Sequence, residues 1–410
     1  DLSPNKTIKF SNLSGSRAYD VRVNGVNVLV APCGLLGTIT SVVKTLSLFL
    51  GDSETLFQSN IDFLEEKGLL APNTPFYNTT QSIPASMIKS GDYLAVLRLD
   101  GLDPMIAFGT GGVTGHSTVA VWEGTGADRQ LYIVESTDAD PIGKVYWPPP
   151  YGIIRTPYEQ WITQAIAAQY HVNLLPISPK LTFDEDAFWS WFRVVEGEEY
   201  GYSRMLLSFL DTSDPQWSLP APIDDKVETW LLNTLDTVLP YDPSNPSAKV
   251  TTYRMLIEGA NNRLNSTCFS IACLQDILIP KNMSIVSVLA MPELDSYRYN
   301  GSYEMVCSEF AARTWQHGFG SQFPDFQGSE QTPKDNYQMA VFDPTFFDKT
   351  NCPTGLRQSA NGNYCQLMGQ WQLDLNEFNS IALYPQMNNH CGSQWPKYQR
   401  CPDGTNNCKC

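Results

Sequence analysis

The sequence predicts an α+β protein in which an antiparallel sheet packs on helices, with an N-terminal extension and a disulfide-rich C-terminal tail. Residues 116–124 and 129–137 are rich in β-forming side chains and flank a polar turn, as two adjacent antiparallel strands do. Residues 158–169 and 184–197 have the apolar spacing of amphipathic helices. Six of the ten cysteines fall in the last sixty residues, where aliphatic runs are few.

The length of 410 residues exceeds one ordinary hydrophobic core and allows two or three modules. We expect a mixed strand and helix region at 1–84, a central domain at 85–345 with a helical insertion, and a cysteine-rich tail at 346–410. A link rich in proline and asparagine at 71–84 supplies the first boundary. Within the first region, Ser53 is placed to cap a helix.

The cysteines indicate an oxidising compartment, because a tail that buries little apolar surface depends on covalent cross-links. The disulfide candidates are Cys268, Cys273, Cys352, Cys365, Cys391, Cys401, Cys408 and Cys410. A zinc site is the alternative, but His390 is the only histidine of the tail and no repeated CxxC pair accompanies it. Of the two remaining cysteines, Cys33 stands in an apolar setting far from the rest, and we expect it to be unpaired together with Cys307.

Sequons for N-glycosylation agree with the secretory route. They begin at Asn5, Asn12, Asn78, Asn265, Asn282 and Asn300. The chain starts at Asp1 without an apolar leader, as expected of a mature chain whose signal peptide has been removed. These observations predict a secreted protein or one of the lysosomal or endolysosomal lumen.

The net charge of −16 argues against nucleic acid and anionic membrane surfaces as partners, since both would repel the chain. We expect no transmembrane segment. The most apolar stretch, 26–50, is interrupted by Asn27, Pro32 and Lys44 and fits a buried globular segment better. The sequence leaves the oligomeric state open.

Three residues have the chemistry of a thiol hydrolase, which needs a thiol, a nearby imidazole and a polar group that orients the imidazole. Cys307 precedes the helical segment 308–318, and exposed N–H groups at a helix start lower a thiol pKa. His116 begins a strand after a glycine-rich loop, and Glu135 ends the next strand. If the two strands pair, His116 and Glu135 lie near the same end of the hairpin.

Structural explanations exist for each of these residues. Cysteine is often buried or disulfide-bonded, His116 alone could be a structural hydrogen-bonding group, and Glu135 could be an ordinary strand-end carboxylate. Other sites have weaker support. The loop at 109–115 lacks the lysine of a P-loop, and no segment has the ligand rhythm of an EF-hand, so no metal and no cofactor is expected.

Five motifs in order resemble the circularly permuted papain-like cysteine hydrolases, the YiiX-like branch of the NlpC-type superfamily. They are Gly91-Asp92 in "KSGDYLAVL", then "GHSTVAVW", "LYIVEST", "GEEYGYS" and "VCSEFAARTW". The resemblance covers roughly 85–345 and is most specific at the "GH" and "CSE" elements. It implies a permuted papain-like core in which histidine precedes cysteine along the chain.

The resemblance implies Cys307 as nucleophile, His116 as general base, Glu135 as the orienting group and Tyr200 as a substrate-pocket residue. Gly201 departs from the family, which commonly has an acidic residue there. The implied activity is hydrolysis of an amide, peptide-like bond through an acyl-enzyme, with peptide-like, cell-wall or lipid-amide substrates. Two alternatives stay open: a lipid acyltransferase or phospholipase on the same fold, and a catalytically silent secreted binding or structural glycoprotein.

Overall fold

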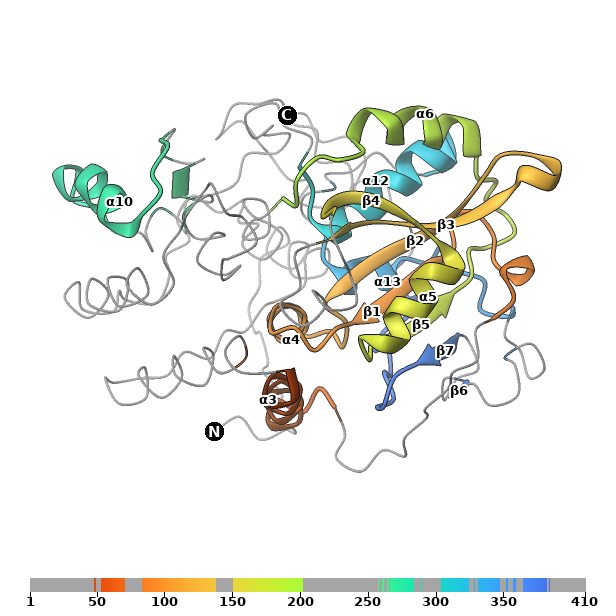
Figure 1. Ribbon diagram of the computed structural model, residues 1–410, viewed down its shortest axis with the longest axis horizontal. Helices are drawn as coiled ribbons and strands as arrows, with labels where there is room; N and C mark the ends of the chain where they lie inside the picture. The colour runs from red at the N-terminus through yellow and green to blue at the C-terminus, as the bar shows by residue number, and fades with distance from the viewer. Residues whose placement is uncertain are drawn as a thin grey trace, which may run out of the picture.

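A computed structural model of the protein (Figure 1) describes the chain in seven stretches with gaps between them. The stretches are 53–70, 83–137, 150–201, 266–283, 304–323, 331–346 and 364–381, with a few isolated positions besides. Mixed helices and strands form one central sheet with helices against it, which confirms the predicted α+β class.

The seven-stranded sheet is antiparallel throughout, with the order β4-β3-β2-β1-β5-β7-β6. Its strands are β1 (Tyr93–Leu97), β2 (His116–Glu123), β3 (Gln130–Thr137), β4 (Gly152–Pro157), β5 (His171–Leu175), β6 (Arg357–Gln358) and β7 (Cys365–Met368). β2 and β3 are neighbours joined by the polar turn, as predicted, and Val119 lies opposite Val134. The start of β2 therefore lies near the end of β3.

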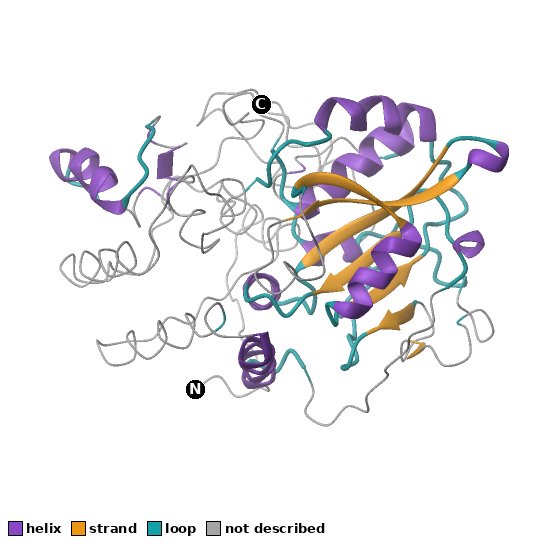
Figure 2. Ribbon diagram, in the orientation of Figure 1, coloured by secondary structure: helices purple, strands orange, loops and turns teal. Residues whose placement is uncertain are grey.

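Seven α-helices accompany the sheet among the described residues. They are α3 (Ser53–Glu66), α4 (Leu102–Thr110), α5 (Tyr158–Ala167), α6 (Glu185–Val195), α10 (Ile271–Leu278), α12 (Cys307–Phe319) and α13 (Pro333–Gln338). Figure 2 shows α5 against one face of the sheet, with α6 and α12 beyond the other face. The order along this direction is helix, sheet, helix.

Alternation along the strands divides the core between the two faces. Tyr93 and Ala95 of β1 pack in one cluster with Phe188 of α6 and Trp315 of α12. Leu94 and Val96 of β1, on the opposite face, pack in a second cluster with residues of α5. Both faces are buried, so the sheet is the middle layer.

The turn before β1 shows why the Gly-Asp pair stands there. Gly91 has φ of +96°, and a Cβ atom at this position would press on the ring of Phe319 at the end of α12. The Asp92 carboxylate accepts the backbone N–H groups of Lys89 and Ile177, each at 2.8 Å. The pair therefore ties the entry of β1 to the chain beyond β5.

The tail contributes to this sheet. β7, inside the predicted cysteine-rich region 346–410, pairs with β5, and Leu373 and Leu375 belong to the main core. Helix α3 of the predicted N-terminal region also contributes Ile61 and Leu64 to that core. Parts of the first and last predicted regions thus pack with the central one.

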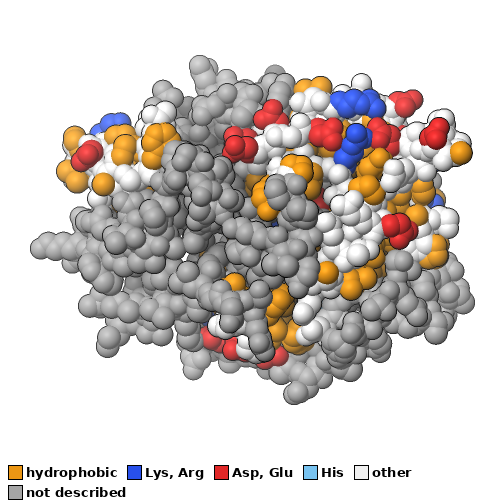
Figure 3. All heavy atoms as spheres, viewed as in Figure 1, with side chains coloured by type: hydrophobic (Ala, Val, Ile, Leu, Met, Phe, Trp, Pro, Cys, Tyr) orange, Lys and Arg blue, Asp and Glu red, His pale blue; other side chains and the backbone are white. Residues whose placement is uncertain are grey.

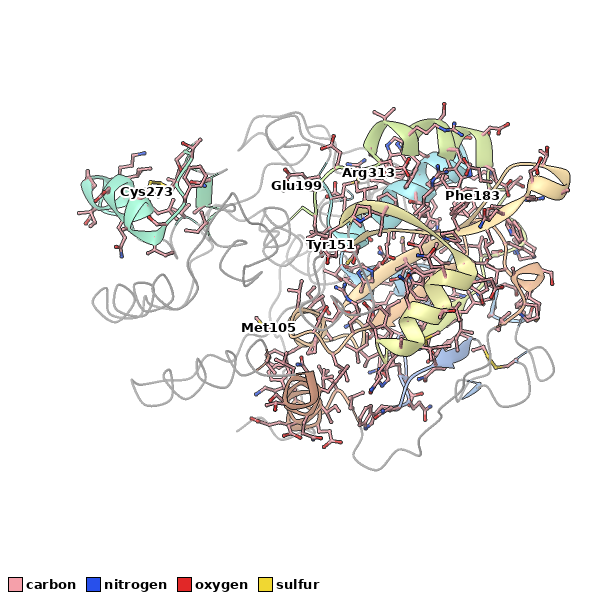
Figure 4. The ribbon with its side chains drawn as sticks, in the orientation of Figure 1. Met105, Tyr151, Phe183, Glu199, Cys273 and Arg313 are labelled. Atoms are coloured by element: carbon pink, nitrogen blue, oxygen red, sulfur yellow. A yellow bond between two sulfur atoms is a disulfide. The ribbon has the colours of Figure 1, made fainter. Side chains whose placement is uncertain are left out.

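Four of the disulfide candidates are described residues, and they form two disulfides. Cys268 bonds Cys273, which is on α10 (Figure 4), and Cys352 bonds Cys365 of β7. The remaining disulfide candidates, Cys391, Cys401, Cys408 and Cys410, lie outside the described residues, as does Cys33. Within the described stretches no helix is both long and apolar enough to cross a bilayer.

Candidate active site

His116 and Glu135, predicted to lie at one end of a hairpin, are in direct contact. The Nε2 atom of His116 is 2.6 Å from Oε2 of Glu135, and both side chains are buried. His116 is the first residue of β2 and lies opposite Val96 of β1. Val96 and Ile133 of β3 pack on the α5 side of the sheet. Since side chains two residues apart share a face, His116 and Glu135 both lie on that side.

Trp161 completes this pair from the helix above. Its indole N–H donates to Oε1 of Glu135 at 2.8 Å. Trp161 is fully buried on α5, where Tyr158, Trp161, Ile162 and Ala165 form the apolar stripe of an amphipathic helix. Both oxygens of Glu135 are therefore engaged by different donors, which fixes the rotation of the carboxylate.

Cys307 is the first residue of α12, as the sequence predicts. No disulfide involves it, and it is the only unpaired cysteine among the described residues. The structure thus excludes, within these residues, the explanation that Cys307 serves a cross-link.

The thiol lies against the residue that precedes His116. The sulfur of Cys307 donates to the carbonyl oxygen of Gly115 at 3.8 Å, and the hydroxyl of Tyr200 donates to the sulfur at 3.8 Å. His116 forms no hydrogen bond with the sulfur in this arrangement. Its Nδ1 atom is buried and has no hydrogen-bond acceptor or donor in the described part of the chain. Nδ1 is therefore the ring nitrogen that no described group engages.

The electrostatics favour a neutral resting pair. Burial raises the pKa of the Cys307 thiol to about 11, and Asp103 adds to the rise, while Arg98, the Ser117 backbone N–H and the Tyr200 hydroxyl oppose it. Burial, followed by the charge of Arg98, lowers the pKa of His116 below its ordinary value against the influence of Glu135. The expectation that the helix start lowers the thiol pKa is wrong for this closed site, because desolvation outweighs it.

Tyr200, a predicted substrate-pocket residue, packs against the start of α12. Its backbone forms a bridge with Met305, two residues before Cys307, and its ring belongs to a small apolar cluster with Cys307. The other members of this cluster are Leu102, Ile106 and Val306. Gly201 packs against the backbone of Met305, and a Cβ atom there would press on it. Glycine at this position thus allows two chain segments to approach closely.

Asn336 of α13, which the sequence did not single out, braces the start of α12. Its amide donates to the carbonyl of Ser308 at 3.1 Å and to the hydroxyl of Ser117 at 3.2 Å. The hydroxyls of Ser117 and Tyr93 are 2.7 Å apart. This network joins the strand that carries His116 to the helix that carries Cys307. No pattern in the sequence pairs these residues, because they come from four distant segments.

The remaining predicted sites fall elsewhere. Asn282 is exposed in a turn after α10 and suits a glycan acceptor; Asn5, Asn12, Asn78, Asn265 and Asn300 lie outside the described residues. Among the described residues no group of three or more His, Cys, Asp or Glu side chains is placed to hold a metal ion.

An open cleft of about 670 Å³ is lined in part by Trp122, Arg129 and Glu185. Trp122 is near the far end of β2, about 20 Å along the strand from His116. The cleft therefore does not expose the thiol.

Comparisons of the chain with family models, with curated proteins and with solved structures found no match. The assignment of a site therefore depends on the geometry of the side chains themselves.

Proposed function

We propose that the protein is a thiol hydrolase that cleaves an amide, peptide-like bond, with Cys307 as nucleophile, His116 as general base and Glu135 as the group that orients His116. The observation that carries the proposal is the buried Nε2–Oε2 contact of 2.6 Å between His116 and Glu135, together with the unpaired Cys307 thiol, which donates to the carbonyl of the residue before His116. A carboxylate held from both sides fixes the orientation of the imidazole, as a general base requires.

Glu135 sets the tautomer that the reaction needs. Its Oε2 atom can only accept a hydrogen bond from neutral His116 while the carboxylate is ionised, so the ring proton stays on Nε2. Nδ1 then keeps its lone pair and accepts the proton of the Cys307 thiol as sulfur attacks the carbonyl carbon of the substrate. The cation that forms on His116 is stabilised by the charge of Glu135.

The later steps use the start of α12. Its first backbone N–H groups have no acceptor within the helix and can donate to the oxygen that becomes negative in the tetrahedral intermediate. When the intermediate collapses, the C–N bond breaks and Nδ1 of His116 returns its proton to the leaving amine. Water, deprotonated by Nδ1, then cleaves the thioester and restores the thiol.

The neutral resting state makes the thiol a weak nucleophile near pH 7. Cys307 is only 2 % exposed and His116 is fully buried. Attack therefore requires the sulfur to leave the Gly115 carbonyl and approach Nδ1, and the proton transfer accompanies attack instead of preceding it.

The test is turnover of chromogenic substrates by the full chain. Wild type, Cys307→Ala and the surface variant Glu123→Gln would be assayed on peptide-like anilides and on acyl esters of increasing length. We expect turnover in wild type and Glu123→Gln, and its loss by a factor of at least 10³ in Cys307→Ala. Equal turnover in the alanine variant would reject the proposal and favour a binding role for the fold.

An acyl-lipid substrate is the second candidate, because the thiol lies among apolar side chains. Leu102 and Ile106 of α4 and Val306 form the cluster around Cys307 and Tyr200. Such a wall favours an apolar acyl group. In the same assay this function predicts rates that rise with the length of the acyl chain, and transfer to an added alcohol or amine in competition with water.

A further inference from the structure

A buried cluster of three charged residues lies beside the proposed site. The guanidinium of Arg98 donates from Nη2 to Oδ1 of Asp103 at 2.8 Å and from Nε to Oδ2 at 3.2 Å. Its Nε atom is also 3.0 Å from Oδ2 of Asp100. The side chains of Arg98 and Asp103 are 1 % and 0 % exposed, so this is an interior ion cluster.

The cluster joins three elements at one end of the sheet. Arg98 directly follows β1, and Asp103 is in the first turn of α4. The Nη1 atom of Arg98 donates to the hydroxyl of Thr137, the last residue of β3, at 3.3 Å. Thr137 is two residues beyond Glu135 and shares its face of the sheet. Because β2 lies between β1 and β3, the side chain of Arg98 crosses β2 at the end of the strand that starts with His116.

Asp103 also presses on the peptide before His116. A Cβ atom at Gly115 would overlap the Cα, carbonyl and Cβ atoms of Asp103, so only glycine allows this approach. The N–H of Gly115 donates to the carbonyl of Val96 at 3.1 Å. The carbonyl of Gly115, in turn, accepts the thiol of Cys307. The position of Gly115 is thus fixed on one side by α4 and on the other by β1.

A buried ion cluster is weak evidence for stability. Removing ions from water is costly, and apolar residues of similar volume often serve a core equally well. Surface ion pairs cost less to form, and the chain has these too: Arg155 and Arg193 both bind Glu123. Figure 3 shows basic and acidic side chains next to one another on the surface near α6. The buried cluster therefore calls for a role that needs fixed charge and fixed geometry.

We propose that Arg98, held by Asp100 and Asp103, is a positioning residue that fixes the Gly115–His116 peptide and sets the charge around His116. The inference rests on the proposed function, in which Nδ1 of His116 receives the thiol proton. Arg98 acts through Gly115 and His116 and does not touch the reacting atoms.

Three charged groups act on His116 from the elements around it. Glu135 belongs to β3, and Arg98 and Asp100 follow β1. Among them, Arg98 lowers the pKa of His116 through its charge, and Asp100 raises it. Removing Arg98 and removing Asp100 must therefore move the titration of His116 in opposite directions, which loss of packing alone does not do.

The experiment is a pH titration of the four histidines of the full chain, labelled with ¹³C at Cε1 and followed by NMR. The resonance of His116 is identified by its loss in His116→Asn. We expect Arg98→Met to raise the pKa of His116 and Asp100→Asn to lower it. The matched control Arg155→Met removes a partly exposed arginine of β4 and should leave the titration unchanged.

A conservative variant separates charge from geometry. Arg98→Lys keeps the positive charge, but an ammonium group cannot reach Asp100, Asp103 and Thr137 together. We expect the pKa of His116 in Arg98→Lys to equal that of wild type. The rate of Cys307 alkylation by iodoacetamide should fall by about tenfold. Should Arg98→Met fail to fold, Arg98→Lys and Asp100→Asn still supply both readouts.

The inference is overturned if the pKa of His116 stays unchanged, or moves in the same direction, in Arg98→Met and Asp100→Asn while only the free energy of unfolding falls. The cluster would then be purely structural. The titration does not require turnover, so it distinguishes this failure from failure of the proposed function. Turnover that survives in Cys307→Ala would reject the function and leave the electrostatic result standing.

Discussion

Glu135 is held between His116 and Trp161, with Oε2 2.6 Å from Nε2 of the imidazole and Oε1 2.8 Å from the indole nitrogen. An indole N–H is always a donor, and His116 presents a second donor when its proton is on Nε2. The two acceptor oxygens of Glu135 satisfy one donor each. The carboxylate therefore specifies one tautomer of the histidine, and this relationship can be tested directly.

Glu135→Gln should reverse that tautomer. The amide has one oxygen, which Trp161 engages, so its NH₂ group faces His116 and donates to Nε2; the ring proton then moves to Nδ1. We expect the rate of thiol alkylation or turnover to fall by about 10²–10⁴. Nitrogen NMR of labelled histidine reports the tautomer. Glu123→Gln, on the same sheet, is the control, and retention of the Nε2 tautomer in Glu135→Gln would contradict the argument.

The reactivity of Cys307 toward iodoacetamide should rise with pH without a plateau at low pH. Because burial raises the thiol pKa to about 11, only a small fraction is ionised at pH 7, and each pH unit below 11 lowers the rate about tenfold. The measurement is the alkylation rate of Cys307 from pH 5 to 10, mapped by mass spectrometry. A pH-independent rate between pH 5 and 7 would instead show a preformed thiolate–imidazolium pair.

Tyr200→Phe should weaken the reactivity of the thiol with little effect on folding. The Tyr200 hydroxyl donates to the sulfur at 3.8 Å, which lowers the thiol pKa, so its removal raises that pKa further. We expect the alkylation rate at pH 8 to fall severalfold and the free energy of unfolding to change by about 1 kcal/mol or less. Tyr132→Phe removes a comparable hydroxyl that bonds Gln130 on β3 and should change neither quantity.

Elements with a strong local pattern could be predicted from the sequence. The β2–β3 hairpin, α5 and α6 follow from alternation and from spacing of three and four residues, and all three are confirmed. The start of α12 at Cys307 is also confirmed. The hairpin brings His116 and Glu135 together because, in an antiparallel pair, the start of one strand lies beside the end of the next.

Other features depend on long-range contacts that local patterns do not encode. Helix α4 was not predicted, because the glycine-rich loop that follows it dominates the local signal. β7 pairs with β5 across almost two hundred residues, and Trp161 reaches Glu135 only because α5 packs on that face. The thiol pKa was predicted with the wrong sign, because a helix start is visible in the sequence while burial is a property of the assembled core.

His171 should make the protein less stable in acid. It is fully buried at the start of β5, and its Nε2 atom accepts the backbone N–H of Gln370 at 3.0 Å, which requires an unprotonated Nε2. Burial lowers the pKa of His171 to about 4 from 6.5. Between these values the unfolded chain binds more protons than the folded one, so stability is complete above about pH 7 and is lost as pH falls toward 4.

The expected loss from His171 over this window is about 3 kcal/mol of unfolding free energy. His171→Gln offers an amide oxygen to the Gln370 N–H and cannot be protonated, so this part of the pH dependence should disappear. Urea unfolding of both proteins from pH 4 to 8 measures it. The difference between the two curves isolates His171, because Asp92, whose pKa burial raises to about 7, titrates in both. Gln370→Ala, which keeps the backbone donor, should follow the wild-type curve; parallel curves for wild type and His171→Gln would show that His171 does not titrate in this range.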